Sequence, residues 1–298
     1  MLPFTSISPQ VARRRPLRRL LAIVTPAALG LAALVVVPPA VADHDVSATD
    51  GVFTVRSCPH THTLRDDPIV YPGAPGAAHL HEFFGNTTTD AHSTTASLVN
   101  GGTTCERPED KAAYWIPTLY EGGQRVDPRA MIAYYRTGTL HNPQDIQPFP
   151  LGLRMIAGNG HATTPQNTRI VNWNCTKRSD IGATSSAPTS CPEQSQLRLR
   201  IEFPNCWDGR RLTSSDQSHM AYSHRNGGWC PLSHPVEMPS MKVGVQFPIS
   251  GTYGKLTLSS GSTLTGHADF WNAWDETELA RLVEECLHGA LSCKGPDQ

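Results

Sequence analysis

Two short residue pairs have the spacing of metal ligands on a β-strand. His79 and His81 are two residues apart, and so are His267 and Asp269. Residues i and i+2 of a strand point to the same face, so each pair could direct two donor atoms at one ion. Three imidazole nitrogens and a carboxylate oxygen form a donor set typical of zinc, iron, manganese or copper sites. The sequence therefore predicts one divalent transition metal here; the alternative is that these side chains only form hydrogen bonds in a polar loop region.

A second group of reactive side chains lies in the irregular segment 203–239, which is too poor in aliphatic residues to order itself by burial. A bridge from Cys206 to Cys230 is expected to hold it. Imidazole titrates near neutrality and suits proton transfer. Aromatic rings and a cation suit a carbohydrate cleft. The predicted catalytic residues are His219, His234, Tyr222 and Asp216, and the predicted substrate-binding residues are Trp229 and Arg225.

We expect the two groups to converge. If the bridged loop covers the strand face of His79 and His81, then His219 or His234 should come within one ligand sphere of them. A cluster of at least three of the named groups would favour a site, whereas wide separation of His79 from both His219 and His234 would indicate structural histidines and favour a non-catalytic binding protein. The histidines expected to stay outside are His60, His62, His92, His141, His161 and His288.

The eight cysteines and the N-terminal residues indicate export. A basic region, the apolar stretch 20–37 and a small-residue site at 40–42 are typical of a signal peptide. The stretch 20–37 is also just long enough to be an uncleaved membrane anchor. An even cysteine count in an exported chain predicts disulfides. The expected pairs are Cys58–Cys105, Cys175–Cys191, Cys206–Cys230 and Cys286–Cys293.

The remaining chain, 43–298, is long enough for a single large secreted domain. Removing the five leader arginines from 25 basic residues leaves 20, against 26 acidic residues. This acidic balance argues against a nucleic-acid partner, because phosphate binding needs a basic surface. Membrane contact is expected only through an uncleaved N-terminal segment.

The hydrophobic pattern predicts a mainly β fold. Leu197 to Phe203 alternates apolar and polar residues, and several aromatic runs punctuated by Gly and Pro have the same character. A helix is expected only after residue 274, with Asp275 as its N-cap, Glu278 closing a capping box and Gly289 at its end. We therefore predict a two-sheet sandwich or jelly roll with long disulfide-bridged loops and one C-terminal helix.

The order of several motifs resembles one known family. These motifs are DDPIVYPGAPGAAHLHEFFGN, YWIPTLY, PFPLGLRMIAGN, FPNCWDG, SHMAYS, CPLSHPVEMP and GHADFWNAWD, and they extend over about 66–274. They are similar to the secreted bacterial and fungal proteins grouped as domain of unknown function 1996. The resemblance implies export and an extracellular role, in fungal relatives sometimes beside carbohydrate-binding modules, and it assigns no reaction or catalytic residue.

Two functions remain open from the sequence. One is an exported enzyme that acts on polysaccharide or cell-wall material, with a histidine-rich, metal-binding cleft. The other is a non-catalytic extracellular protein that binds carbohydrate or belongs to the envelope. The motifs GxSxG, GxxxxGK[ST], HExxH and helix-opening GxGxxG are missing, which disfavours hydrolase-fold esterases, nucleotide-dependent enzymes, zincin proteases and Rossmann dehydrogenases.

Overall fold

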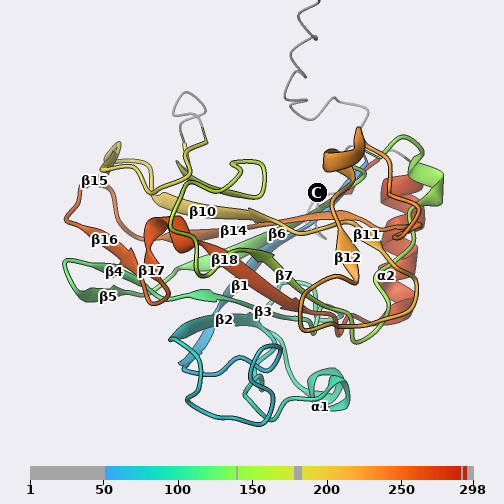
Figure 1. Ribbon diagram of the computed structural model, residues 1–298, viewed down its shortest axis with the longest axis horizontal. Coiled ribbons are helices and arrows are strands. Elements are labelled where there is room, and N and C mark those ends of the chain that lie inside the picture. The colour runs from blue at the N-terminus through green and yellow to red at the C-terminus, as the bar shows by residue number, and fades with distance from the viewer. Residues whose placement is uncertain (1–50, 139, 178–182, 290, 294–298) are drawn as a thin grey trace, which may run out of the picture. The chain divides into compact units, whose positions relative to one another are not determined.

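Alternating residues form the strands of this protein, as β10 (Leu197–Glu202) illustrates. Its leucines and isoleucine are buried and its arginines are half-buried on the other face. The computed structural model describes residues 51–138, 140–177, 183–289 and 291–293, all within the unit Asp45–Gln298 (Figure 1). The segment 1–42, predicted to be a signal peptide or a membrane anchor, lies outside the described residues. Among those that are described, no helix is long and apolar enough to cross a membrane.

One ten-stranded sheet contains most of the strand residues, and its order is β7-β18-β3-β2-β1-β6-β14-β10-β8, with β19 beside β1. Its neighbours are antiparallel except for the parallel pair of β1 and β19. Its strands are β1 (Val52–Leu64), β2 (His81–Gly85), β3 (Ala113–Pro117), β6 (Ala130–Arg136), β7 (Arg154–Gly158), β8 (Val171–Cys175), β10, β14 (Ser240–Phe247), β18 (His267–Trp271) and β19 (Ser292–Cys293).

The long strand β1 joins the two layers of a sandwich. Its first part, 52–59, pairs with β6, and its last part, 60–64, pairs with β2, with irregular register in both pairings. One layer therefore contains β6, β14, β10 and β8, and the other contains β2, β3, β18 and β7. Aromatic side chains fill the space between them, including Phe270 of β18, whose ring lies 5.2 Å from Tyr114 and 6.0 Å from Phe203. The mainly β, sandwich-like fold is confirmed.

Smaller sheets extend the ends of the sandwich, as Figure 1 shows for β4, β5, β16 and β17. They consist of β4 (Leu119–Glu121), β5 (Gln124–Val126), β16 (Leu256–Leu258) and β17 (Gly261–Ser262); of β11 (Cys206–Trp207), β12 (Met220–Ala221) and β13 (Val236–Glu237); and of β9 (Ser190–Cys191) with β15 (Gly251–Thr252). Short 3-10 turns occupy Pro143–Asp145, Ser223–Asn226 and Thr263–Thr265.

The C-terminal helix begins where the sequence predicts it. Asp275 accepts a hydrogen bond from the backbone N–H of Glu278 and caps α2 (Glu276–Leu282), which continues as a π-helical turn, Val283–His288, to Gly289. The expected capping-box role of Glu278 is not seen, because its carboxylate instead binds Arg281. A second helix, α1 (Thr95–Asn100), was not expected from its Thr- and Ser-rich sequence; Thr94 and Ser97 form its capping box.

The outer face of the β2, β3 and β18 layer is covered rather than exposed. The segment between β1 and β3, with α1, packs over it, and Figure 1 shows α1 and its loops beside β2. A second small core forms there, separate from the core of the sandwich. Its buried members are Phe83, Leu98, Ala113, Trp115, Trp271 and Ala273.

The four expected disulfides are present: Cys58–Cys105, Cys175–Cys191, Cys206–Cys230 and Cys286–Cys293. No free cysteine remains. The last bridge ties the end of the helix to β19, and so to β1. Four disulfides indicate that the chain folds in an oxidising compartment.

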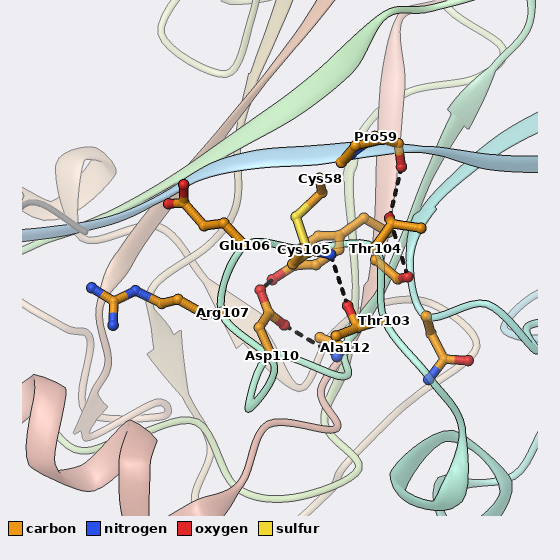
Figure 2. The surroundings of a disulfide bond; sticks show 12 residues. Cys58, Pro59, Thr103, Thr104, Cys105, Glu106, Arg107, Asp110 and Ala112 are labelled. Carbon is orange, nitrogen blue, oxygen red and sulfur yellow. Dashed lines mark hydrogen bonds between the residues drawn. A yellow bond between two sulfur atoms is a disulfide. The ribbon is translucent and has the colours of Figure 1, made fainter. Parts of the chain in front are cut away.

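A buried polar network lies beside the first disulfide, where Figure 2 shows Asp110 next to Cys105. Asp110 is fully buried and accepts hydrogen bonds from the Ala112 N–H at 3.1 Å and from the Tyr114 hydroxyl at 2.9 Å. The Tyr114 hydroxyl in turn lies 2.7 Å from that of Tyr135. Burial is the largest influence on the Asp110 carboxyl and raises its pKa to about 7. Asp110 is thus neutral over part of the pH range in which an exposed carboxyl is charged.

Candidate metal centre

Strand register brings the predicted metal ligands onto one face. The central strand β3 lies between β2 and β18, and it aligns Pro117 with His81 and Trp115 with Asp269. His267 lies two residues before Asp269, so it falls in the same row as His81 and Pro117. Pro117 carries only a compact ring, and the two imidazoles approach above it with centroids 5.9 Å apart. The row thus places His81 and His267 side by side although 186 residues separate them in the sequence.

His79 completes a three-histidine cluster with them. The ligand-capable atoms of His79, His81 and His267 all lie within 4.8 Å of one another. The Nε2 atoms of His79 and His267 are 3.2 Å apart. Two nitrogens bound at roughly 2.0–2.1 Å to one tetrahedral ion lie about 3.3 Å apart, so this separation fits a shared ion. It also fits a hydrogen bond between the two rings.

Backbone carbonyls fix the tautomers of the two buried histidines. The Nδ1–H of His81 donates to the Asp66 carbonyl at 2.9 Å, and that of His267 donates to the Thr265 carbonyl at 2.8 Å. Each ring therefore keeps a lone pair on Nε2 for the cluster. A metal-bound histidine commonly uses its second nitrogen in this way, which sets both the tautomer and the ring orientation.

The buried carboxyl groups of Asp67 and Asp269 lie next to His81 of this cluster. Acceptor atoms of Asp67, His81 and Asp269 form a second group within 4.8 Å of one another. Neither oxygen of Asp269 has a hydrogen-bond partner among the described residues, and Asp269 is 1% exposed. The Nε2 of His81, also buried, has none either. Such orphaned acceptors are costly unless a cation or donor satisfies them, and their chemistry fits a divalent metal.

Burial determines the charge state of this cluster. It lowers the pKa of His81 well below the usual value, and the neighbouring His79 and His267 lower it further. It also lowers the pKa of His267, to about 4. The Asp269 carboxyl has its pKa raised well above normal by burial and then by the charge of Asp67. Neutral imidazoles need lose no proton to bind a metal, so the three rings are ready ligands near neutral pH.

His79 is half-buried and is the most accessible of the three histidines. It precedes β2 instead of lying in it, so the expected strand over the whole pair is corrected: only His81 is within the strand. Its ring still lies 4.2 Å, between centroids, from that of His81. Burial, followed by the charges of His161 and Arg65, lowers the pKa of His79.

His161, which the sequence placed outside, lies near the cluster. Its charge lowers the pKa values of both His79 and His267. The turn that carries it packs on His267: a Cβ on Gly160 would lie 3.0 Å from the Cε1 of His267. Across this turn is an open pocket of about 430 Å³, whose lining includes Gly158, His161, Gln166, Tyr222 and Arg225. The pocket and the histidine cluster are therefore neighbours.

The predicted catalytic histidines do not join the cluster. Both nitrogens of His219 have protein partners, the Ser214 hydroxyl at 2.8 Å and the Arg154 carbonyl at 2.7 Å. Those of His234 lie 2.9 Å from the Ser233 hydroxyl and 2.9 Å from the Ser218 carbonyl. Among the described residues, neither belongs to any group of three potential ligands. The expected convergence with His79 and His81 is therefore wrong.

The reason is the position of the bridged loop along β7. His219 binds the carbonyl of Arg154 at the first residue of that strand, whereas His267 pairs with Gly158 at its last. Four residues of strand span roughly 13 Å, which is far beyond one ligand sphere. The part of the Cys206–Cys230 loop that carries His219 therefore contacts β7 at the end away from the cluster, whereas Tyr222 and Arg225 of the same loop reach the pocket beside the His161 turn.

The other predicted site residues of that loop have separate positions. The half-buried Tyr222 donates its hydroxyl to the Glu202 carbonyl at 3.1 Å, and the exposed Arg225 lies over its ring at 5.0 Å. Asp216 is exposed and caps the Ser218 N–H, and its pKa is lowered to about 2 chiefly by hydrogen bonding to Ser218. It does not hydrogen-bond to His219 or His234. Trp229 is 55% exposed and stacks on His141 at 4.1 Å.

Sequence reasoning missed Asp67 and the role of the backbone around it. Asp67 is buried and its Oδ1 accepts hydrogen bonds from the Ile69 and Val70 N–H groups. The signal was present as an Asp-Asp-Pro turn in the same motif as His79 and His81. A turn carboxylate is normally exposed, and only the covering of this face by the loop makes it part of the cluster.

Comparison with known proteins gives one result. No curated protein and no solved structure matches the chain. The family model described as domain of unknown function (DUF1996) matches residues 67–274. This span holds Asp67, the three clustered histidines and Asp269, so the whole candidate centre lies inside the matched region. The chain belongs to the DUF1996 family.

Proposed function

We propose that this protein is an exported metalloenzyme acting on polysaccharide or cell-wall material. The observation that carries the proposal is the convergence of three histidines beside buried carboxylates that have no partner. His79, His81 and His267 would hold one divalent transition metal, and Asp269 and Asp67, which form a separate group with His81, would supply negative charge beside it. The proposal retains the metal site predicted from the sequence. The reactive centre is now this metal site and no longer the loop histidines His219 and His234.

A divalent transition metal in such a site supplies Lewis acidity and can lower the pKa of a bound water. The chain's own residues do the rest. The carbonyls of Asp66 and Thr265 hold the His81 and His267 rings in one tautomer. The covering segment and the second core exclude bulk water from the buried side. His79, half-buried, marks the side from which a substrate can approach.

The pocket across the His161 turn is a suitable place for a sugar chain. Its lining combines amide side chains, a cation and the Tyr222 ring, which is the mixture that carbohydrate ligands use. Tyr222 and Arg225, predicted from the sequence as site residues, both belong to this lining. Their part in the proposal is to bind a polymer beside the metal, and no proton transfer is assigned to them.

The test joins metal content to activity. Purified protein freed of metal and reloaded with zinc, copper or manganese is incubated with insoluble cell-wall polysaccharide, and soluble sugar release is followed. The expected result is metal-dependent release by the wild type and by His92→Ala, an exposed histidine outside the cluster, and loss of both bound metal and release in His79→Ala. Release that is unchanged after metal removal would contradict the proposal.

The second candidate is a non-catalytic extracellular protein that binds carbohydrate. It is favoured by the loop residues, because His219, His234 and Tyr222 are committed to backbone carbonyls. This function would give retention on insoluble polysaccharide without product and without dependence on metal. The same incubation distinguishes the two, since bound and released fractions are measured together.

A further inference from the structure

Three arginines gather on the outer face of the other layer, away from the histidine cluster. Arg136 lies on β6, and Arg198 and Arg200 lie on β10, with β14 between these strands. Together with Tyr134 and Gly244 they line a hollow of about 220 Å³. We call it the arginine cradle. A concentration of cations is notable here because the chain after residue 42 carries an excess of acidic residues.

Gly244 of β14 creates the space for the cradle. The register places it between Ile132 of β6 and Arg200 of β10, at the centre of the layer's outer face. A Cβ at this position would lie 3.4 Å from the Arg198 Cδ and 3.9 Å from the Arg200 Cγ. The aliphatic stems of both arginines therefore lie over the bare backbone, which lets two like charges share one hollow.

Uncharged side chains contact the guanidinium groups of Arg198 and Arg136. The Nε of Arg198 donates to the Asn174 amide oxygen at 2.9 Å, which leaves its two terminal nitrogens for another acceptor. The Arg136 guanidinium lies 5.1 Å from the centre of the Tyr134 ring. The nearby Lys242 is already paired with Glu202 at 2.7 Å. Among the described residues, no carboxylate lies within ion-pair distance of Arg198 or Arg200.

Adjacent like charges at a half-buried site repel each other, and an anion between them relieves the repulsion. Guanidinium groups form paired, parallel hydrogen bonds to planar or tetrahedral oxyanions. We propose that the arginine cradle binds an oxyanion, namely a carboxylate or a phosphate group. This site is separate from the metal centre, and its existence does not depend on the proposed enzymatic function.

The test is calorimetric titration of the purified protein with inorganic phosphate, with sulfate and with glucuronate. Saturable binding is expected for the wild type, weakening as sodium chloride is added, because the contact is ionic. Arg198→Gln and Arg200→Gln are each expected to raise the Kd about tenfold or more, since each removes a charge-assisted hydrogen bond. Arg210→Gln, which changes an exposed arginine on the bridged loop, should leave the Kd unchanged.

The ligands distinguish the source of the oxyanion. Phosphate binding without glucuronate binding indicates a phosphate-bearing ligand, and the reverse indicates a carboxylate such as a sugar acid. Arg200→Lys keeps the charge but not the paired donors, so its Kd should lie between those of the wild type and Arg200→Gln. This variant also provides a folded protein to measure if Arg200→Gln does not fold. The proposal is overturned if the wild type binds none of the three anions saturably, or if the Arg198 and Arg200 variants bind them as the wild type does.

Discussion

Replacing Asp110 with asparagine should change how stability depends on pH. In the folded chain Asp110 is buried beside Cys105, and burial raises its pKa from 3.8 to about 7. In the unfolded chain it loses its proton near pH 4. Between these values only the unfolded state gains by ionisation, so the contribution of Asp110 to stability is complete below about pH 4 and is lost as pH rises to about 7.

The expected size follows from that difference. A shift of about three pKa units corresponds to roughly 4 kcal/mol, since one unit is about 1.36 kcal/mol. The asparagine side chain of this variant cannot ionise, and its amide oxygen can still accept from the Ala112 N–H or the Tyr114 hydroxyl. The free energy of unfolding of Asp110→Asn, relative to wild type, should therefore increase by about 4 kcal/mol from pH 4 to pH 8.

Guanidinium chloride unfolding with the disulfides intact, repeated at pH 4, 5.5, 7 and 8, measures this difference. Asp127→Asn is the matched control, because Asp127 is 62% exposed, and its difference from wild type should vary by no more than about 0.5 kcal/mol over the same range. A stability difference between Asp110→Asn and wild type that stays constant from pH 4 to pH 8 would refute the reasoning.

Three further predictions concern the two ends of the β7 layer. Replacing Cys206 and Cys230 by serine opens a loop of sequence separation 24 and should lower the free energy of unfolding by about 3.5 kcal/mol without changing metal stoichiometry, as denaturation and metal analysis would reveal. Asp269→Asn should keep the fold but weaken metal binding about 10- to 100-fold in a competitive chelator titration, because it removes the buried negative charge; unaltered affinity would exclude Asp269 as a ligand. His219→Ala should destabilise by about 1–3 kcal/mol, since the Arg154 carbonyl and Ser214 lose their partner, and metal loss in this variant would contradict its placement outside the centre.

Local features of the fold could be predicted from the sequence. Alternation in 197–203 identified a strand, Asp275 marked the start of the helix, and short separations gave three of the four disulfides, leaving Cys58 and Cys105 for the fourth. These features depend on neighbours within a few tens of residues. The Thr- and Ser-rich helix α1 was missed because its capping box, rather than any apolar period, defines it.

The candidate site could be predicted only in part, because register between distant strands cannot be read from one sequence. The spacing of His79, His81 and His267 indicated ligands, and β3 is what brings them into one cluster. Asp67 lies beside the cluster because the segment that carries it folds over the outer face of the layer. The positions of His219 and His234 were predicted wrongly because the sequence does not show which end of β7 they lie near. The hydrogen bond from His219 to the Arg154 carbonyl places His219 at the start of β7.

The most direct test of the central claim is a titration of metal-free protein with zinc, and in parallel with copper and manganese, followed by calorimetry and by elemental analysis after dialysis. The structure predicts one bound zinc per chain in the wild type and in His92→Ala, and loss of that site in His79→Ala and in His267→Gln. Circular dichroism of each variant confirms that it is folded. A folded wild type that binds no zinc, copper or manganese, or a His79→Ala protein that binds metal as the wild type does, would contradict the metal centre.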